Sequence, residues 1–247
     1  NCYATAKTVD VGGITVTDEA GLKSDEVLAA LNAGDNGNAF VKGDDGLPVL
    51  SWMKSGGSDP PLAEPKWNEG GYYEIETAQQ LGWLRDQVNA GNLNNHSDFS
   101  AKLMNDITLT EANWTPIGVV ADWATVFSDA PFAGVFDGQG HAIRGLNIDR
   151  TASASVGLGL FALINGGTIQ NLTVYGQVKA KLEKADYASY SVGGVVGQST
   201  SAKLTRVVSY VNVTSTNEGS IASAVGGLVA NGASVVITEC ANFGNVS

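Results

Sequence analysis

Three short glycine-led apolar blocks recur in the second half of the chain, at residues 159–162, 194–197 and 227–230. Their first residues lie 35 residues apart (159 to 194) and then 33 residues apart (194 to 227). Ten residues after each block an apolar side chain returns, and another follows six residues later; these are Leu172 and Val178, Val207 and Val213, and Cys240 and Val246. Only the polar segments before the second and third blocks differ in length. Constant offsets joined by variable loops indicate stacked strands of one repeating unit.

This spacing predicts an all-β fold, a right-handed parallel β-helix in which each repeat forms one rung of a solenoid. Inward apolar residues of one rung stack on equivalent residues of the next at about 4.8 Å, so equivalent positions must recur. Glycines mark the corners at which the chain turns. Residues 132–138 and 143–148 have the pattern of an earlier, shorter rung, so the predicted stack runs from about residue 114 to the end.

A capping helix is predicted before the stack, over residues 78–90. Thr77 is the N-cap, Gly91 ends the helix, and Leu81, Leu84 and Val88 share one apolar stripe. An uncovered first rung would expose both its core and its unpaired strand edge. We therefore expect this helix to close the N-terminal end of the solenoid, with the strand at residues 101–104 following it.

The pattern divides the chain into three parts. Residues 1–52 are predicted to form a terminal rung and a small α/β capping unit, with a second short helix over residues 24–33. Residues 53–71 are rich in proline, glycine and serine and are predicted to be a linker. Residues 72–247 are the predicted β-helix.

The two ends of the chain have similar sequences. Residues 1–6 align with residues 239–244, with Cys2 opposite Cys240. The N-terminus thus resumes at the rung phase at which the C-terminus stops, as expected of a segment cut across a longer repeat array. This match predicts either head-to-tail self-association or self-capping of the last rung through residues 1–52.

Composition narrows the classes of function. The formal net charge is −11 with 14 lysine and arginine residues, which argues against binding nucleic acid. No apolar run reaches the roughly 20 residues of a membrane span, so no membrane insertion is expected. The two cysteines form no CxxC motif and no ligand cluster with histidine. We expect no metal and no cofactor.

The chain resembles the GLUG-motif β-helix repeats of extracellular bacterial proteins, including surface proteins and immunoglobulin A-cleaving peptidases. The resemblance covers nearly all of residues 72–247 and is carried by residues 103–107, 113–118, 136–141 and the three glycine-led blocks; residues 47–52 are similar to the segment that closes such arrays. Ala162 and Ala230 depart from it, since glycine is common there. The resemblance implies an extracellular, secreted or surface-attached protein. In peptidases of that family the catalytic domain lies elsewhere, so it implies no active site here.

One polar cluster could carry chemistry: Asp137, His141, Arg144, Asp149 and Arg150. Carboxylates beside a histidine or arginine could abstract a sugar ring proton, as polysaccharide-cleaving β-helix enzymes require. Residues 137–140 also have the composition of a tight turn, and we favour that interpretation. Residues 35–38 and 44–46 could bind Ca²⁺ but lack EF-hand spacing, so turns are again favoured, and His96 is expected to be solvated.

Aromatic residues in the variable loops are the remaining candidates for binding. Trp123, Tyr187 and Tyr190 are predicted ligand contacts, because exposed rings could stack on sugars. The sequence thus favours a non-catalytic structural or adhesive module that presents loops to host protein or glycan. A pure glycan-binding module is the second hypothesis, and a polysaccharide lyase or hydrolase is the third.

Overall fold

The computed structural model describes residues 9–11, 14–16, 27, 29, 40–42, 48–50, 63–93, 99–120, 129–183, 189–218 and 222–247. The chain divides into two compact units, Asn1–Pro61 and Leu62–Ser247. In the first unit, β1 (Val9–Val11) pairs antiparallel with β2 (Ile14–Val16), and β3 (Phe40–Lys42) pairs antiparallel with β4 (Pro48–Leu50). Val27 and Ala29 are helical, which places them inside the predicted helix over residues 24–33.

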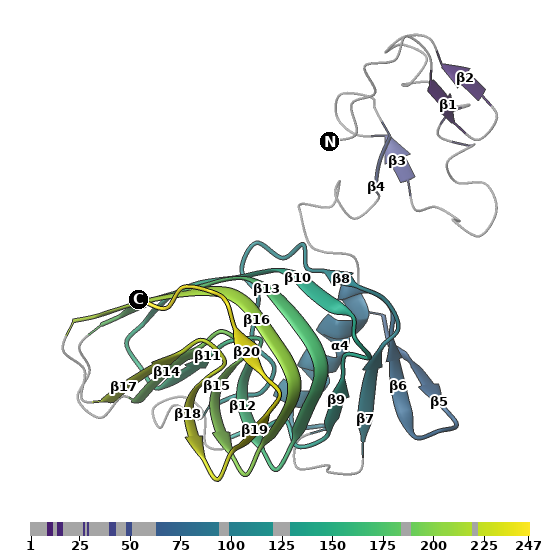
Figure 1. Ribbon diagram of the computed structural model, residues 1–247. Coiled ribbons are helices and arrows are strands. Elements are labelled where there is room, and N and C mark those ends of the chain that lie inside the picture. Colours follow the sequence, from purple (N-terminus) through teal and green to yellow (C-terminus); the bar gives the residue numbers. More distant parts are fainter. Residues whose placement is uncertain are drawn as a thin grey trace. The chain divides into compact units, whose positions relative to one another are not determined.

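The second unit is a parallel β-solenoid of about four turns, so the predicted fold class is confirmed. In Figure 1 the strands follow one another from the blue β5 to the yellow β20. The largest sheet has the order β19-β16-β13-β9-β7-β6-β5, with β8, β10 and β20 attached. Its strands are β5 (Lys66–Asn68), β6 (Tyr72–Ile75), β7 (Ser100–Leu103), β8 (Ile107–Thr108), β9 (Val135–Asp137), β10 (Ala142–Ala152), β13 (Thr168–Leu182), β16 (Lys203–Asn217), β19 (Val236–Thr238) and β20 (Ala241–Asn242).

Two three-stranded parallel sheets complete the rungs. One has the order β11-β14-β17 and the other β12-β15-β18. Their strands are β11 (Val156–Leu158), β12 (Phe161–Asn165), β14 (Ser189–Gly193), β15 (Val196–Thr200), β17 (Ala222–Gly226) and β18 (Val229–Ala233). Each full rung thus takes one strand from each of three sheets.

The register of the rungs is the one that the glycine-led blocks predict. Phe161 lies beside Val196, which lies beside Val229 in the next rung. The later offsets hold as well: Leu172 is beside Val207, and Val213 bridges Val178 and Val246. Recurring apolar positions therefore stack because parallel strands in register bring equivalent side chains into contact.

The N-terminal end of the solenoid is covered by α4 (Ala78–Asn89). Thr77 and Gln80 form a capping box, and the predicted stripe of Leu81, Leu84 and Val88 is fully buried. Gly91 has a φ of +82°, the left-handed conformation that glycine adopts most readily after a helix.

Polar contacts fix α4 against the segment that precedes the first complete rung. The guanidinium of Arg85 donates to Glu111 at 2.7 Å and lies 4.7 Å from the ring centroid of Trp114. The amide of Asn89 donates to the Pro116 carbonyl oxygen at 3.0 Å and accepts from the Gly118 N–H at 2.7 Å. These contacts hold the apolar face of α4 on the core of the solenoid.

Strand β5 corrects the predicted linker. It lies within residues 53–71, yet it pairs antiparallel with β6 at the edge of the largest sheet, with Lys66 3.3 Å from Glu74. The solenoid therefore begins before residue 72. An antiparallel strand with a charged side chain is an effective terminator of a parallel sheet, because it offers a poor template for further pairing.

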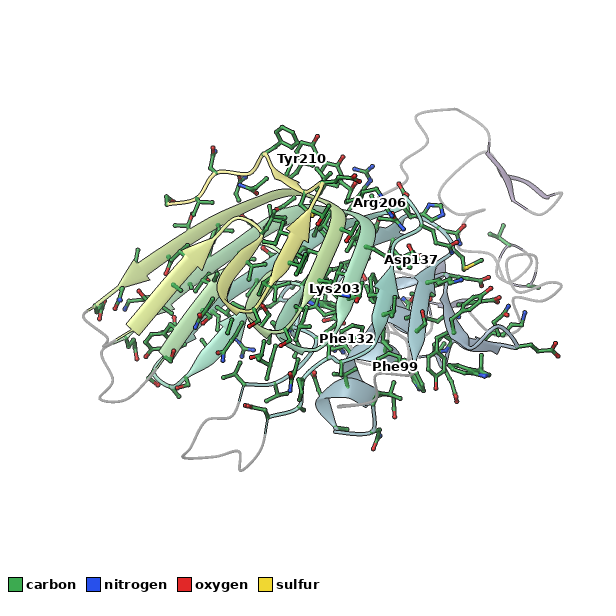
Figure 2. The ribbon with its side chains drawn as sticks, turned by 60° about the horizontal axis from the view of Figure 1, so that its bottom comes forward. Phe99, Phe132, Asp137, Lys203, Arg206 and Tyr210 are labelled. Carbon is green, nitrogen blue, oxygen red and sulfur yellow. The ribbon has the colours of Figure 1, made fainter. Side chains whose placement is uncertain are left out.

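Phenylalanine rings form the centre of the core. Phe99, Phe132 and Phe161 follow one another edge to face, with ring centroids 5.3 and 5.1 Å apart, and Phe136 contacts Phe161 at 5.5 Å. Figure 2 shows Phe99 and Phe132 close together. Edge-to-face pairs add about 0.5–1.5 kcal/mol each to the burial of the rings, so this chain of aromatics ties successive rungs together.

Candidate functional site

A line of polar side chains follows one corner of the solenoid, where the chain bends within the largest sheet. Gln139, Asn171, Arg206 and Glu239 occupy this corner in successive rungs, and each has a φ between +50° and +56°. Non-glycine residues are uncommon in this conformation, and asparagine tolerates it best. The bend turns each of these side chains outward, and we call the four residues the corner ladder.

Hydrogen bonds connect the corner ladder from rung to rung. The Arg206 Nε–H donates to Asn171 Oδ1 at 2.7 Å, and Arg206 Nη1 lies 3.5 Å from Glu239 Oε2. Asn171 in turn donates to Asp137 Oδ1 at 2.8 Å. Figure 2 shows Asp137 and Arg206 at the same edge of the solenoid as Tyr210.

The Asp137 carboxylate accepts three hydrogen bonds at this corner. Its Oδ1 also accepts from the Gln139 N–H at 2.9 Å, and its Oδ2 accepts from the Gln170 amide at 2.9 Å. Burial raises the pKa of this carboxyl, but hydrogen bonds from Asn171, the Gln139 backbone and Gln170 outweigh burial, so the pKa lies below its usual value. Asp137 is therefore an ionised hydrogen-bond acceptor and a weak base.

A cleft of about 500 Å³ opens beside the corner ladder. It is lined by Asp137, Gln139, Gly140, Asn171, Leu172, Thr173 and Arg206. Carboxylate, amide, hydroxyl and guanidinium groups therefore border one hollow, above the apolar side chain of Leu172. We call this hollow the corner cleft. Its chemistry suits a polar ligand that forms many hydrogen bonds.

A second polar group lies where the neighbouring strands β8 and β10 begin, with Asp106 just before β8, His141 just before β10 and Arg144 within β10. His141 Nδ1 lies 3.4 Å from Asp106 Oδ1, and Arg144 lies 3.6 Å from Asp106 Oδ2. The pKa of Asp106 is lowered, first by the hydrogen bond from the Ala142 N–H and then by His141 and Arg144. This carboxylate is engaged by three neighbours, so it is poorly suited to accept a substrate proton.

Aromatic rings run along the outer face of the largest sheet. Tyr175 stacks on Tyr210 at 4.8 Å, Tyr210 stacks on Phe243 at 5.1 Å, and the Arg144 guanidinium covers Tyr175 at 4.4 Å. Each ring thus uses its faces on its neighbours. The stack ties the rungs together, and only the ring edges and the outer face of Phe243 remain for other contacts.

The structure brings together part of the predicted polar cluster. Asp137, His141 and Arg144 lie near the corner, although His141 and Arg144 pair with Asp106 instead of Asp137. Asp149 lies farther along β10, where its backbone binds the side chain of Asn113. Arg150 lines a different cavity of about 140 Å³ beside α4 and β11. Five residues in one catalytic arrangement are therefore not observed.

Of the three aromatic residues predicted to contact a ligand, the structure describes only Tyr190. Tyr190, expected to be an exposed loop residue, is 1% exposed, and its hydroxyl donates to the Glu183 carbonyl oxygen at 2.9 Å. This ring belongs to the core of β14 and cannot stack on a ligand in this conformation, which corrects its expected role. Trp123 and Tyr187 lie outside the described residues, as do His96 and the turns at residues 35–38 and 44–46.

The corner ladder was not identified from the sequence. The signal was nevertheless present, because Asn171, Arg206 and Glu239 each stand one residue before Leu172, Val207 and Cys240. Within the described ranges no three His, Cys, Asp or Glu side chains are grouped so that they could hold a metal, and no helix is long and apolar enough to cross a membrane.

Comparisons with known proteins do not assign the chain to a family. No family model and no curated protein matches it. Among solved structures it is similar to a "putative immunoglobulin A1 protease from Bacteroides ovatus", with 14% sequence identity and a TM-score of 0.34. The match covers 72% of this chain and 68% of that one.

Replacing Asp137 by asparagine is expected to lower the free energy of unfolding at neutral pH by about 1.5–3 kcal/mol. The Gln139 N–H and the side-chain amides of Gln170 and Asn171 would lose a charged hydrogen-bond acceptor. A pKa that is lower in the folded state stabilises the protein above the unfolded-state pKa of about 4, and this stabilisation is lost as the pH falls through the folded-state value. The difference between D137N and the parent should therefore shrink on acidification. Urea denaturation from pH 7 to pH 3 measures it.

Glu239→Gln is the matched control for this measurement. The Glu239 side chain is 64% exposed and has a long ion pair with Arg206, so its replacement should change stability by under about 1 kcal/mol. An equal pH dependence of the two variants would contradict the role assigned to Asp137.

Proposed function

We propose that this chain is a non-catalytic adhesive module of a secreted or surface-attached bacterial protein, of the GLUG-motif type, and that it binds glycan in the corner cleft. The corner cleft carries the proposal, because side chains from successive rungs line it. Solenoids use such extended surfaces to hold extended partners. The hydroxyl, amide and charged groups that line the corner cleft match the hydrogen-bonding capacity of sugar hydroxyls.

The state of the acids favours binding over catalysis. A general base must be free to accept a proton and have a pKa near the working pH. Asp137 and Asp106 are both engaged by hydrogen-bond donors, and both have lowered pKa values. A polysaccharide-cleaving activity is the second candidate, and the pairing of His141 with Asp106 is the observation that favours it. Turnover of a polysaccharide that His141→Ala abolishes would replace our proposal with that one.

Arg206→Asn tests the corner cleft. Asparagine tolerates the left-handed backbone of this position, so the fold should be preserved while the guanidinium is removed. We expect binding of a glycan selected on an array to weaken about tenfold or more, the effect of losing one charge-assisted hydrogen bond of about 1.5–3 kcal/mol. Isothermal titration calorimetry gives the affinities.

Lys181→Asn is the control. Lys181 is exposed, pairs with Glu218 at 3.3 Å and lies at the far end of β13 from Asn171. Its replacement removes the same charge and should leave the affinity unchanged. Equal losses in both variants would indicate non-specific attraction, and failure of the parent protein to bind any glycan would overturn the proposal.

A further inference from the structure

Two tyrosines of neighbouring rungs stand directly beside one another on the outer face of the largest sheet. Tyr175 of β13 and Tyr210 of β16 are register partners in parallel strands. Their ring centroids are 4.8 Å apart, and their ring planes differ by 4°. Parallel strands are about 4.8 Å apart, so the register of the sheet itself holds the two phenol rings face to face.

The aromatic stack gives each of these phenols one phenol neighbour. The Arg144 guanidinium covers the other face of Tyr175, and Phe243 covers the other face of Tyr210. Neither of these groups is a phenol. Among the described residues, Tyr175 and Tyr210 are the only two tyrosines whose rings are in contact.

The pair is open to a reagent in solution. Tyr210 is 42% exposed, and Tyr175 is half-buried. Figure 2 shows Tyr210 at the outer surface of the solenoid. Tyr190, by contrast, is 1% exposed, and its hydroxyl donates to the Glu183 carbonyl oxygen. An oxidant of phenols can therefore reach Tyr210 and is kept away from Tyr190.

We propose that Tyr175 and Tyr210 form a modification site at which a one-electron oxidant, such as a peroxidase acting with hydrogen peroxide, joins the two rings in a dityrosine link. Each phenol gives up one electron and one proton, and the two phenoxyl radicals combine at carbon atoms ortho to the oxygens. The hydrogen on each coupled carbon then moves as a proton to the oxygen, which restores the aromatic rings. Two hydrogen atoms leave the protein, and one hydrogen peroxide becomes two water molecules.

The fold brings the reacting carbons together before any radical forms. Groups that are held in contact react far faster than groups that must meet by diffusion. The ring edges of Tyr175 and Tyr210 face outward, so the rings can tilt toward one another at their edges without entering the core. The link therefore forms within one chain, between neighbouring rungs.

Such a link would act as a covalent staple of the solenoid. It would close a loop of 35 residues, from 175 to 210, which contains the whole of β14 and β15. Closing a loop covalently restricts the unfolded chain and so favours the folded one. Oxidation at this site would thus strengthen the module.

Peptide mapping of the full chain tests the proposal. The chain is treated with a peroxidase and hydrogen peroxide, reduced with a thiol so that disulfides do not contribute, and separated on a denaturing gel. Trypsin cleaves after Arg150, Lys179 and Arg206, which places Tyr175 in peptide 151–179 and Tyr210 in peptide 207–247. We expect these peptides to be joined in the monomer band, with the loss of two hydrogen atoms. Absence of this product from the monomer band would overturn the proposal.

Selectivity separates the stack from general oxidation. Tyr72 and Tyr73 fall in peptide 67–85, and neither ring contacts Tyr175 or Tyr210. Links from that peptide to 151–179 or 207–247 should be about tenfold rarer or less, because proximity is missing. Comparable amounts would show that the stack does not direct the coupling and would overturn the proposal.

Tyr175→Phe should abolish the joined peptide while keeping the ring stack, because phenylalanine gives no phenoxyl radical. Tyr72→Phe is the matched control and should leave the yield unchanged. A joined peptide that survives Tyr175→Phe would overturn the proposal. The linked parent chain should also unfold at a higher urea concentration than the untreated chain, and an unchanged midpoint would overturn the role as a staple. None of these readouts depends on glycan binding.

Discussion

Replacing Phe161 by alanine is expected to lower the free energy of unfolding by about 3–5 kcal/mol, the usual cost of deleting a buried phenylalanine ring. Phe161 is fully buried in β12 and contacts Phe132 and Phe136 from the preceding rung. Its backbone pairs with Val196 of the following rung. The cavity would therefore open at the centre of the stack, where neighbouring rungs cannot move inward without breaking their sheet register. Urea denaturation followed by circular dichroism measures the loss.

Phe243→Ala provides the comparison. It deletes the same ring, but this ring is 65% exposed and contacts Tyr210 on the outer face. We expect a loss of about 0.5–1.5 kcal/mol, the value of an aromatic pair. Losses of similar size in the two variants would mean that the interior phenylalanines do not hold the rungs together.

Gly176→Ala is expected to cost about 2–6 kcal/mol, because strain and overpacking act together. Gly176 has a φ of +155°, which side chains rarely adopt, and an added Cβ would overlap the backbone carbonyl of Leu146 in the preceding rung. Backbone atoms cannot rotate away as a side chain can, so the pairing of β10 with β13 would have to shift. Thermal and urea denaturation should both report the change.

Gly140→Ala separates the two causes. Gly140 also has a positive φ, +86°, but an added Cβ would meet no atom within 4 Å. Only the cost of the left-handed conformation applies, about 1–2 kcal/mol. If both variants lost the same free energy, the close approach of Leu146 to Gly176 would play no part.

The sequence predicted the stacking of rungs because this stacking depends on local periodicity. Fixed offsets from the glycine-led blocks placed Leu172 beside Val207, and capping chemistry placed Thr77 at the start of α4. Strand β5 was missed because its partner, β6, follows a proline-rich stretch that has the composition of a linker. Short antiparallel edge strands have few residues in which a pattern can show.

The candidate site was harder to predict, because it depends on which side chains face outward at one corner. The composition around Tyr190 is typical of a loop, whereas four of the five residues of β14 are buried and the Tyr190 ring lies among them. Asn171 and Arg206 were overlooked because neither residue type marks a corner by itself. Their left-handed backbone and their mutual hydrogen bond become visible only when the rungs are stacked.

The corner ladder also bears on how such a module can evolve. Each full rung supplies one strand to each of the three sheets and one corner residue, and the rungs of Asn171 and Arg206 keep one continuous register along β13 and β16. Duplication or loss of a whole repeat would therefore lengthen or shorten the outer surface by one strand spacing, about 4.8 Å, and would leave the remaining contacts intact. Reach can thus change in discrete steps, while the chemistry at each step changes through a single outward side chain.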